Sequence, residues 1–228
     1  MLNKDAVKPE LIETLSWLQA SPELASFRLV DGTAIALHIG HRKSADIDLY
    51  STEPANMHAI AQLLSSKFHN GNLAITDEMI AAQGNGIKVE VWHNWMMPFK
   101  QPAIISEGIR LAALEDLAAF KLSAVVGRRE KKDYVDLCFL FDKLGTRKVL
   151  EDFKGYNPWM SLKSLAFALS EARTAQENIS IMPDMIVPFD WQAGFAKILS
   201  AFKMFREIEE INDGAGSSTT TTDHKNLS

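Results

Sequence analysis

Six consecutive residues, 45–50, alternate between apolar and polar side chains. A period of two is the pattern of a half-buried β-strand, here with Ile47 and Leu49 on one face and Asp46, Asp48 and Tyr50 on the other. The two carboxylates then lie on the same face, about 6.6 Å apart along the strand. Acids so placed repel each other unless a cation lies between them, and Mg²⁺ binds a few carboxylates together with phosphate oxygens. The segment therefore predicts a strand that holds a hard cation; the alternative is a surface strand with two solvated acids.

A strand followed directly by a helix is predicted just before this segment. Residues 27–30 have the composition of a short strand, Asp31 and Gly32 interrupt it, and residues 33–41 repeat apolar side chains at helical spacing. Gly32 and Thr33 therefore lie where a helix begins, and free backbone N–H groups with a partial positive charge favour a phosphate there. A glycine at this point lets the backbone approach the phosphate closely.

A third carboxylate, Glu90, lies in a second alternating segment, residues 87–92, which follows the turn sequence Gly84-Asn85-Gly86. If this segment pairs with the first strand, Glu90 joins Asp46 and Asp48. Three acids on adjacent strands suit two-metal nucleotidyl transfer, in which two hold the ions and the third helps to deprotonate the attacking hydroxyl. A solvated acid on an edge strand is the alternative for Glu90.

The pattern changes near Gly108 from mixed strands and helices to helices alone. Before it, we predict further helices over residues 8–20 and 54–68, and weaker strands over 73–76 and 79–83. After it, we predict helices over residues 111–126, 133–144, 161–175 and 191–211, with no strand between them. We therefore expect an α/β domain over residues 1–108, a helical domain over 109–211 and, because a Gly-Ser-Thr-rich end lacks apolar anchors, a disordered tail over 212–228.

Composition excludes several classes of protein. The single cysteine, Cys138, excludes an internal disulfide framework and a Cys-rich zinc site. No apolar run approaches the ~20 residues that span a bilayer, and the first five residues lack the apolar core of a secretory signal, so we expect a cytoplasmic protein without membrane contact. A net charge of −5 argues against a protein that coats nucleic acid by charge alone. Residues 121–148 nevertheless carry eight Lys and Arg against four Asp and Glu, which is either a phosphate-facing patch or the solvated face of two helices.

Three charged residues of the helical half stand out. Lys121 lies at helical spacing from Leu114, Leu117 and Val125, an apolar stripe on which a lysine either reaches a phosphate or extends outward to solvent. Asp133 and Asp136, three positions apart, share one helix face, and either could form a salt bridge with a neighbouring basic residue.

The ordered set of motifs resembles the AbiEii/AbiGii-type nucleotidyltransferases of bacterial abortive-infection and toxin–antitoxin systems. The resemblance rests on LVDGTA (29–34), GHRKSADIDL (40–49), IKVEV (87–91), GIRLAALED (108–116), Lys121 and GRREKKDYVDL (127–137). It covers roughly residues 25–140, with looser similarity to about Phe202. Each motif alone is weak, whereas the set in this order is specific.

This resemblance implies a DNA-polymerase-β-like nucleotidyltransferase fold: an α/β (α+β) domain with a small mixed sheet, followed by an all-helical C-terminal domain. It implies Mg²⁺- or Mn²⁺-dependent transfer of a nucleoside monophosphate from a nucleoside triphosphate to an acceptor, with RNA, in particular tRNA, and a cognate antitoxin as further partners. The implied metal ligands are Asp46, Asp48 and Glu90, and the implied catalytic residues add Lys121 and Asp133. The implied nucleotide-binding residues are Gly32, Thr33, Arg42, Ser44, Lys121 and Asp136.

Two positions depart from the family pattern. Asp31 stands where the family usually has glycine, which brings a negative side chain near incoming phosphates, and Glu90 stands where it usually has aspartate. Both departures keep open a degenerate member that binds a nucleotide or a partner without turnover. A transferase that acts on a small molecule or a protein side chain is the alternative within the enzymes.

Two histidine patterns are weighed against this interpretation. His38-Ile39-Gly40-His41 matches the HIGH signature of class I aminoacyl-tRNA synthetases, but it lies near the end of its predicted helix and no lysine-rich KMSKS-like loop follows. A zinc site built from His38, His41 and His93 lacks a thiolate and a suitably spaced fourth ligand.

Overall fold

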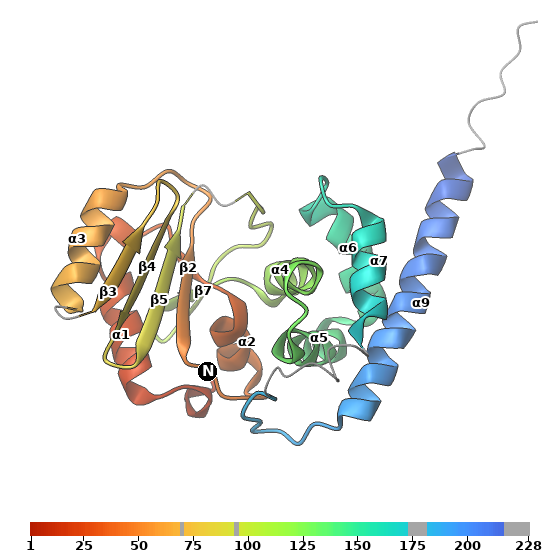
Figure 1. The fold of residues 1–228 in the computed structure, drawn as a ribbon, viewed down its shortest axis with the longest axis horizontal. Coiled ribbons are helices and arrows are strands. Elements are labelled where there is room, and N and C mark those ends of the chain that lie inside the picture. Colours follow the sequence, from red (N-terminus) through yellow and green to blue (C-terminus); the bar gives the residue numbers. More distant parts are fainter. Residues whose placement is uncertain (69–70, 94–95, 173–181, 217–228) are drawn as a thin grey trace, which may run out of the picture.

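The computed structural model describes residues 1–68, 71–93, 96–172 and 182–216, and it divides into a sheet-containing half and a helical half (Figure 1). A mixed seven-stranded sheet has the order β3-β4-β5-β2-β1-β7-β6. Its strands are β1 (Arg28–Leu29), β2 (Asp46–Tyr50), β3 (Asn72–Ile75), β4 (Met79–Gly84), β5 (Ile87–Trp92), β6 (Ile104–Ser106) and β7 (Ile109–Leu111). The predicted α/β fold with a following helical region is therefore confirmed.

The strand β2 lies near the middle of the sheet, between β5 and β1. It runs parallel to β5 and antiparallel to β1, and its buried residues are the apolar ones of the alternating pattern, Ile47 and Leu49. The turn before β5 places Asn85 and Gly86 at φ 55° and 75°. Two successive positive φ values are typical of a tight two-residue hairpin, as the Gly84-Asn85-Gly86 sequence predicted.

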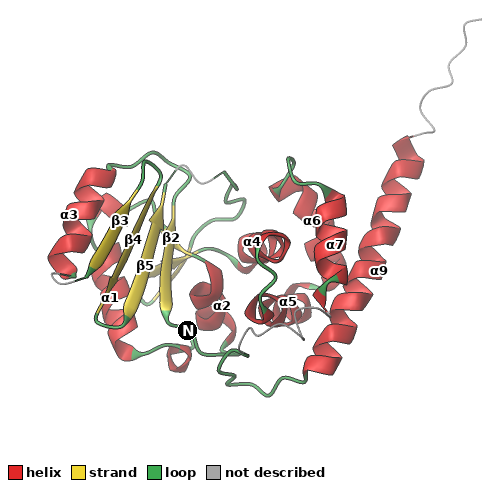
Figure 2. Ribbon diagram, in the orientation of Figure 1, coloured by secondary structure: helices red, strands yellow, loops and turns green. Residues whose placement is uncertain are grey.

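Three long helices accompany the sheet: α1 (Pro9–Gln19), α2 (Asp31–Ile39) and α3 (Met57–Lys67). Helix α1 packs against β2 and β7, and α3 packs against β3 and β4. Helix α2 contacts β2 on one side and the first helices of the other half on the other (Figure 2). Helix α2 ends, as many helices do, at a glycine in the left-handed conformation, since Gly40 takes φ 74°.

The helical half contains α4 (Leu114–Gly127), α5 (Lys131–Leu144), α6 (Thr146–Tyr156), α7 (Leu162–Ser170) and α9 (Trp191–Gly216). Helix α4 is its centre, because it packs against α2, α5, α6 and α7. One contiguous hydrophobic cluster includes buried residues from both halves, from Leu2 to Ile208. In the described part of the chain, no helix has the length and apolarity needed to cross a membrane.

Four sequence expectations need correction. Ile109–Leu111 is a strand, so the sheet extends past the expected boundary at residue 108, and that boundary falls in the β6–β7 turn. The expected helix over 33–41 begins at Asp31 and ends at Ile39, and helix α6 was missed. Helix α9 continues through residues 212–216, which were expected to be disordered; residues 217–228 lie outside the described residues, as does 173–175 of the expected helix.

Candidate active site

The three candidate metal ligands lie on two neighbouring strands. In the parallel pairing of β2 with β5, Asp48 is directly opposite Glu90 and Asp46 is opposite Lys88. The expected pairing of the two alternating segments is therefore present. Glu90 also contacts Lys88, with 2.6 Å between Oε1 and Nζ, and accepts a hydrogen bond from the Trp92 indole at 3.4 Å.

Burial and neighbouring negative charges act together on Asp48. Burial, followed by the charges of Asp31, Glu90 and Asp46, raises the pKa of Asp48 to about 8. Within the described residues, no three His, Cys, Asp or Glu side chains already form a group that could hold a metal ion. The oxygen-only donors and their surplus negative charge nevertheless fit a hard cation that takes one or two carboxylates and completes its shell with substrate phosphate oxygens.

The beginning of α2 lies beside the strand that carries the aspartates. The Thr33 hydroxyl donates to the backbone carbonyl of Asp46 (2.5 Å) and lies 2.8 Å from the Ser44 hydroxyl. These bonds fix the helix start against β2, so that its N–H groups and Asp46 border the same space. Gly32 has a specific reason to lack a side chain, because a Cβ there would lie 2.3 Å from a guanidinium nitrogen of Arg42. We expected a phosphate to approach the backbone of Gly32 closely; in the structure the Arg42 guanidinium does so.

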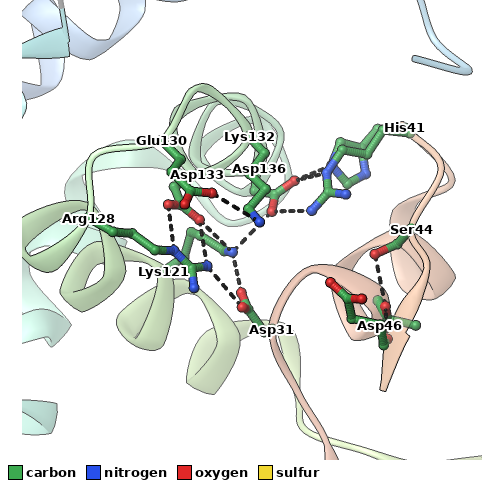
Figure 3. A network of polar contacts seen from close by, with 12 residues as sticks. Asp31, His41, Ser44, Asp46, Lys121, Arg128, Glu130, Lys132, Asp133 and Asp136 are labelled. Atoms are coloured by element: carbon green, nitrogen blue, oxygen red, sulfur yellow. Dashed lines mark hydrogen bonds and ion pairs between the residues drawn. The ribbon is translucent and has the colours of Figure 1, made fainter. Parts of the chain in front are cut away.

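A charged cluster joins the two halves of the molecule at this point (Figure 3). It comprises Asp31, His41, Arg42, Lys121, Arg128, Asp133 and Asp136. Lys121, from α4, has a side chain only 1% exposed, and its ammonium contacts Asp31, Asp133 (3.0 Å) and Asp136 (3.2 Å). The lysine does not extend outward to solvent.

The other two cations of the charged cluster are held by the same carboxylates. The Arg42 guanidinium donates two bonds to Asp136, at 2.6 and 2.8 Å, in a bidentate arrangement, and His41 Nε2 lies 2.7 Å from Asp136 Oδ1. The Arg128 guanidinium donates to both Asp133 and Asp31 at 2.9 Å. Three cations therefore face three carboxylates.

Mutual pairing keeps these groups ionised. Burial would raise the pKa of Asp136, but the charges of Lys121 and Arg42 outweigh it and hold that pKa well below its usual range. Burial would lower the pKa of Lys121, but Asp31, Asp136 and Asp133 together raise it. Asp31 also has a lowered pKa, because Lys121 and Arg128 outweigh its burial.

Asp31 itself is conformationally unusual. It takes φ 52°, in the left-handed region that favours glycine and that aspartate enters at some cost. In this conformation the carboxylate of Asp31 is already bonded to the ammonium of Lys121 and to the guanidinium of Arg128.

A cavity of about 570 Å³ lies over these elements. It is lined by Gly32, Thr33, Ser44, Asp46, Asp48, Asp31 and five cationic residues, namely Lys8, Arg42, Lys43, Lys121 and Lys132. Ala6 and Val7 from the N-terminal segment and Pro183 and Asp184 from the chain before α9 complete its wall. The combination of carboxylates, a helix beginning and several cations suits a bound triphosphate with a divalent cation.

Most of the predicted site residues come together here, but Glu90, Asp133 and Asp136 do not line the cavity. Asp133 and Asp136 have fully buried side chains and lie behind Lys121 and Arg42, so they orient the cations. Arg128, one of the basic residues of the stretch 121–148, is bonded to Asp31 and Asp133. Lys43, Lys132 and the segment at Pro183–Asp184 were missed as cavity residues. Lys43 and Lys132 lie within quoted motifs, whereas nothing in the sequence around Asp184 indicates its place.

The three histidines of the rejected zinc site have different partners. His38 Nε2 lies 2.9 Å from the Ala112 carbonyl oxygen, and His41 Nε2 lies near Asp136. His93 accepts from the Ala55 N–H and lies 2.7 Å from the Asp77 carbonyl oxygen. Each ring therefore has its own structural contact, and the HIGH sequence lies at the end of α2, away from the helix beginning that faces the cavity.

The charged cluster predicts a large effect of Asp136→Asn on stability. The change removes the negative charge that two buried cations share, and breaking a buried ion pair from one side costs about 3–5 kcal/mol. Urea unfolding measures the loss. The matched control is Asp142→Asn, whose partner Lys197 is 2.6 Å away at the surface and whose pairing contributes at most about 1 kcal/mol. Equal losses in the two variants would contradict the structural role of Asp136.

The raised pKa of Asp48 predicts that the stability difference between Asp48→Asn and the parent protein depends on pH. Its folded pKa is about 8 against 3.8 for an unperturbed aspartate, so the folded state binds the proton more tightly and stability falls as pH rises from about 4 to 8. Asparagine has no proton to lose. In EDTA, Asp48→Asn should therefore be more stable than the parent at pH 8 by on the order of 5 kcal/mol, and about equal to it at pH 4. A difference that does not change with pH, measured by denaturant unfolding, would disprove this.

Comparison with known proteins supports the fold. No family model matches the sequence. An uncharacterised protein of Aquifex aeolicus, aq_aa25, is 28% identical over 142 residues, which are 61% of this chain and 69% of that protein.

Solved structures give a fuller match. A protein from H. pylori described as of proposed nucleotidyltransferase activity superposes with a TM-score of 0.55 at 17% identity, over 89% of this chain and 95% of its own. JHP933 from Helicobacter pylori gives 0.52 at 17% identity, over 91% and 94%. The antibiotic-resistance factor ANT(2″)-Ia gives 0.51 at 15% identity, over 72% and 97%. At these identities the likeness concerns the fold, and the chain has a nucleotidyltransferase-like fold with a helical C-terminal region.

Proposed function

We propose that this protein is a nucleotidyltransferase that moves a nucleoside monophosphate from a nucleoside triphosphate to a hydroxyl of an acceptor. The observation that carries the proposal is the meeting of Asp46 and Asp48 on β2 with Glu90 on β5, beside the beginning of α2 and the cations of one cavity. The site then combines negative charge that can hold a cation, N–H groups that can bind phosphate, and cationic side chains that can bind a triphosphate.

The chain's own residues have distinct parts in this reaction. Asp46 and Asp48 would hold Mg²⁺ or Mn²⁺, which when bound neutralises phosphate charge and polarises the attacking hydroxyl. The N–H groups at Gly32 and Thr33 and the side chains of Lys43 and Lys132 bind and orient the triphosphate. Lys121 reaches the triphosphate when its contact with Asp31 is exchanged for one with phosphate.

The chemical step forms one bond and breaks one. The acceptor oxygen attacks the α-phosphorus, and the bond from that phosphorus to the oxygen bridging to the β-phosphate breaks, so pyrophosphate leaves with the electron pair. Glu90 takes up the proton of the hydroxyl, because it lies directly opposite Asp48 in the sheet.

For the acceptor we propose RNA, with the 3′ end of tRNA as the leading candidate, and we propose a cytoplasmic toxin of the AbiEii/AbiGii type that is held by a cognate antitoxin. The ordered motifs of residues 29–137 support this part of the proposal. A second candidate is a degenerate protein that binds without turnover, which is favoured by one observation: Asp31 occupies both Lys121 and Arg128.

Label transfer tests the function. The protein is incubated with each α-³²P-labelled nucleoside triphosphate, Mg²⁺ and total cellular RNA, and the products are separated on denaturing gels. We expect label on RNA, loss of the signal in EDTA, and loss in the folded double variant Asp46→Asn with Asp48→Asn. Label found only on a protein or a small molecule would mean that the acceptor is not RNA. No label at all would favour the degenerate protein.

Asp31→Gly predicts tighter binding of the triphosphate. The charged cluster now balances three cations with three carboxylates, so removing one carboxylate leaves a positive charge for phosphate, and glycine also tolerates φ 52°. Calorimetry in Mg²⁺ should give an affinity gain of about 1 kcal/mol. Asp31→Asn, which removes the charge and still tolerates this backbone, should give a similar gain. Unchanged affinity in both variants would mean that Asp31 does not compete with phosphate.

A further inference from the structure

A second cavity, of about 350 Å³, lies on the other side of Asp31 and Arg128. Both residues line it as well as bordering the charged cluster between the two halves (Figure 3). Its remaining wall comes from the end of β2, from the chain just before Pro98, from α4 and from the turn after α6. The large apolar and aromatic residues of this wall are Tyr50, Met96, Met97, Phe120, Trp159 and Met160.

The lining of this second cavity is largely apolar and includes three aromatic side chains, Tyr50, Phe120 and Trp159. Trp159 is 52% exposed and Met96 is 78% exposed, so large apolar side chains remain open to solvent at its mouth. Its charged residues are Asp31 and Arg128, which bond each other. Such a wall suits a planar ligand with apolar faces and a polar edge, because aromatic rings and thioethers pack well on flat π-systems.

The position of the second cavity relative to the carboxylates links it to the reaction. Tyr50 follows Asp48 by two residues on the same face of β2, which is about 6.6 Å along the strand. Asp31 lines both cavities. A group bound in the second cavity is therefore close to a phosphate bound in the first. The two groups can thus belong to substrates of one reaction.

We propose that the second cavity binds a single unpaired nucleobase, stacked on Trp159. This rests on the proposed function, and the base can belong to the donor triphosphate or to the last nucleotide of the RNA acceptor. Stacking of unpaired bases on aromatic side chains is the common mode of single-strand recognition. An amino sugar with several positive charges is disfavoured, because Asp31, the carboxylate of this wall, is already bonded to Lys121 and Arg128.

Binding of paired probes, in Mg²⁺ and without turnover, tests this. One pair is ATP and inorganic tripolyphosphate, which lacks the base. The other is a four-nucleotide RNA that ends in adenosine and the same RNA with an abasic terminal ribose. The variants are Trp159→Ala and Trp159→Phe, and the matched control is Trp17→Ala, which removes another partly exposed tryptophan, 38% exposed on α1.

We expect Trp159→Ala to weaken the base-containing member of one pair by roughly 5- to 150-fold, to the level of its base-free partner. Trp159→Phe should retain most of the affinity, and Trp17→Ala should leave all four affinities unchanged. An effect on ATP alone assigns the cavity to the donor base, and an effect on the RNA alone assigns it to the acceptor base.

Two results would overturn the proposal. One is a folded Trp159→Ala protein that keeps the preference of the parent for both base-containing probes, and the other is a parent protein that has no such preference. These readouts are independent of label transfer. A protein that binds the base but transfers no label would refute the proposed enzyme and leave the cavity assignment intact, whereas label transfer without a Trp159 effect would do the reverse.

Discussion

The buried ammonium of Lys121 is the constraint on which the rest of this site depends. Moving an ammonium out of water is costly unless other charges compensate, and here Asp31, Asp133 and Asp136 do so from α2 and α5. Because Lys121 belongs to α4, the same contacts connect the helical half to the beginning of α2 and hence to β2. The position of the β2 carboxylates relative to the helical half is thus constrained by ion pairs whose loss would leave charges buried.

The charge balance of the cluster has a consequence for ligands. Three cations are already matched by three carboxylates, so a triphosphate gains attraction from them only when it displaces Asp31. Lys43 and Lys132 and the N–H groups of α2 supply the remaining positive potential of the first cavity. Asp31 also lines both the first cavity and the aromatic second one. Its contacts with Lys121 and Arg128 therefore lie between the two places where we expect substrates.

Local patterns predicted most of the sheet and the carboxylates, because alternation reports directly which residues of a strand share a face. The strands β2, β4 and β5 agree with the predicted segments to within one residue, and Asp48 lies opposite Glu90 as anticipated. The strands β6 and β7 were missed because three residues are too few to display a period. Helix α6, as long as the predicted helices α1 and α3, has apolar residues at 149, 150 and 153 in helical spacing, so its signal was present in the sequence and was missed.

The sequence by itself determined that Asp46 and Asp48 share one face of a strand and that Gly32 and Thr33 begin a helix, because both follow from backbone geometry over a few residues. Only the tertiary structure decided the partners of the charged groups. Asp31 and Lys121 are separated by 90 positions, and Arg42 and Asp136 by 94. Charge type alone leaves such pairings open, since any carboxylate attracts any cation. The packing of α4 and α5 against α2 selects among them, and it places Asp133 and Asp136 behind the cations and away from the cavity.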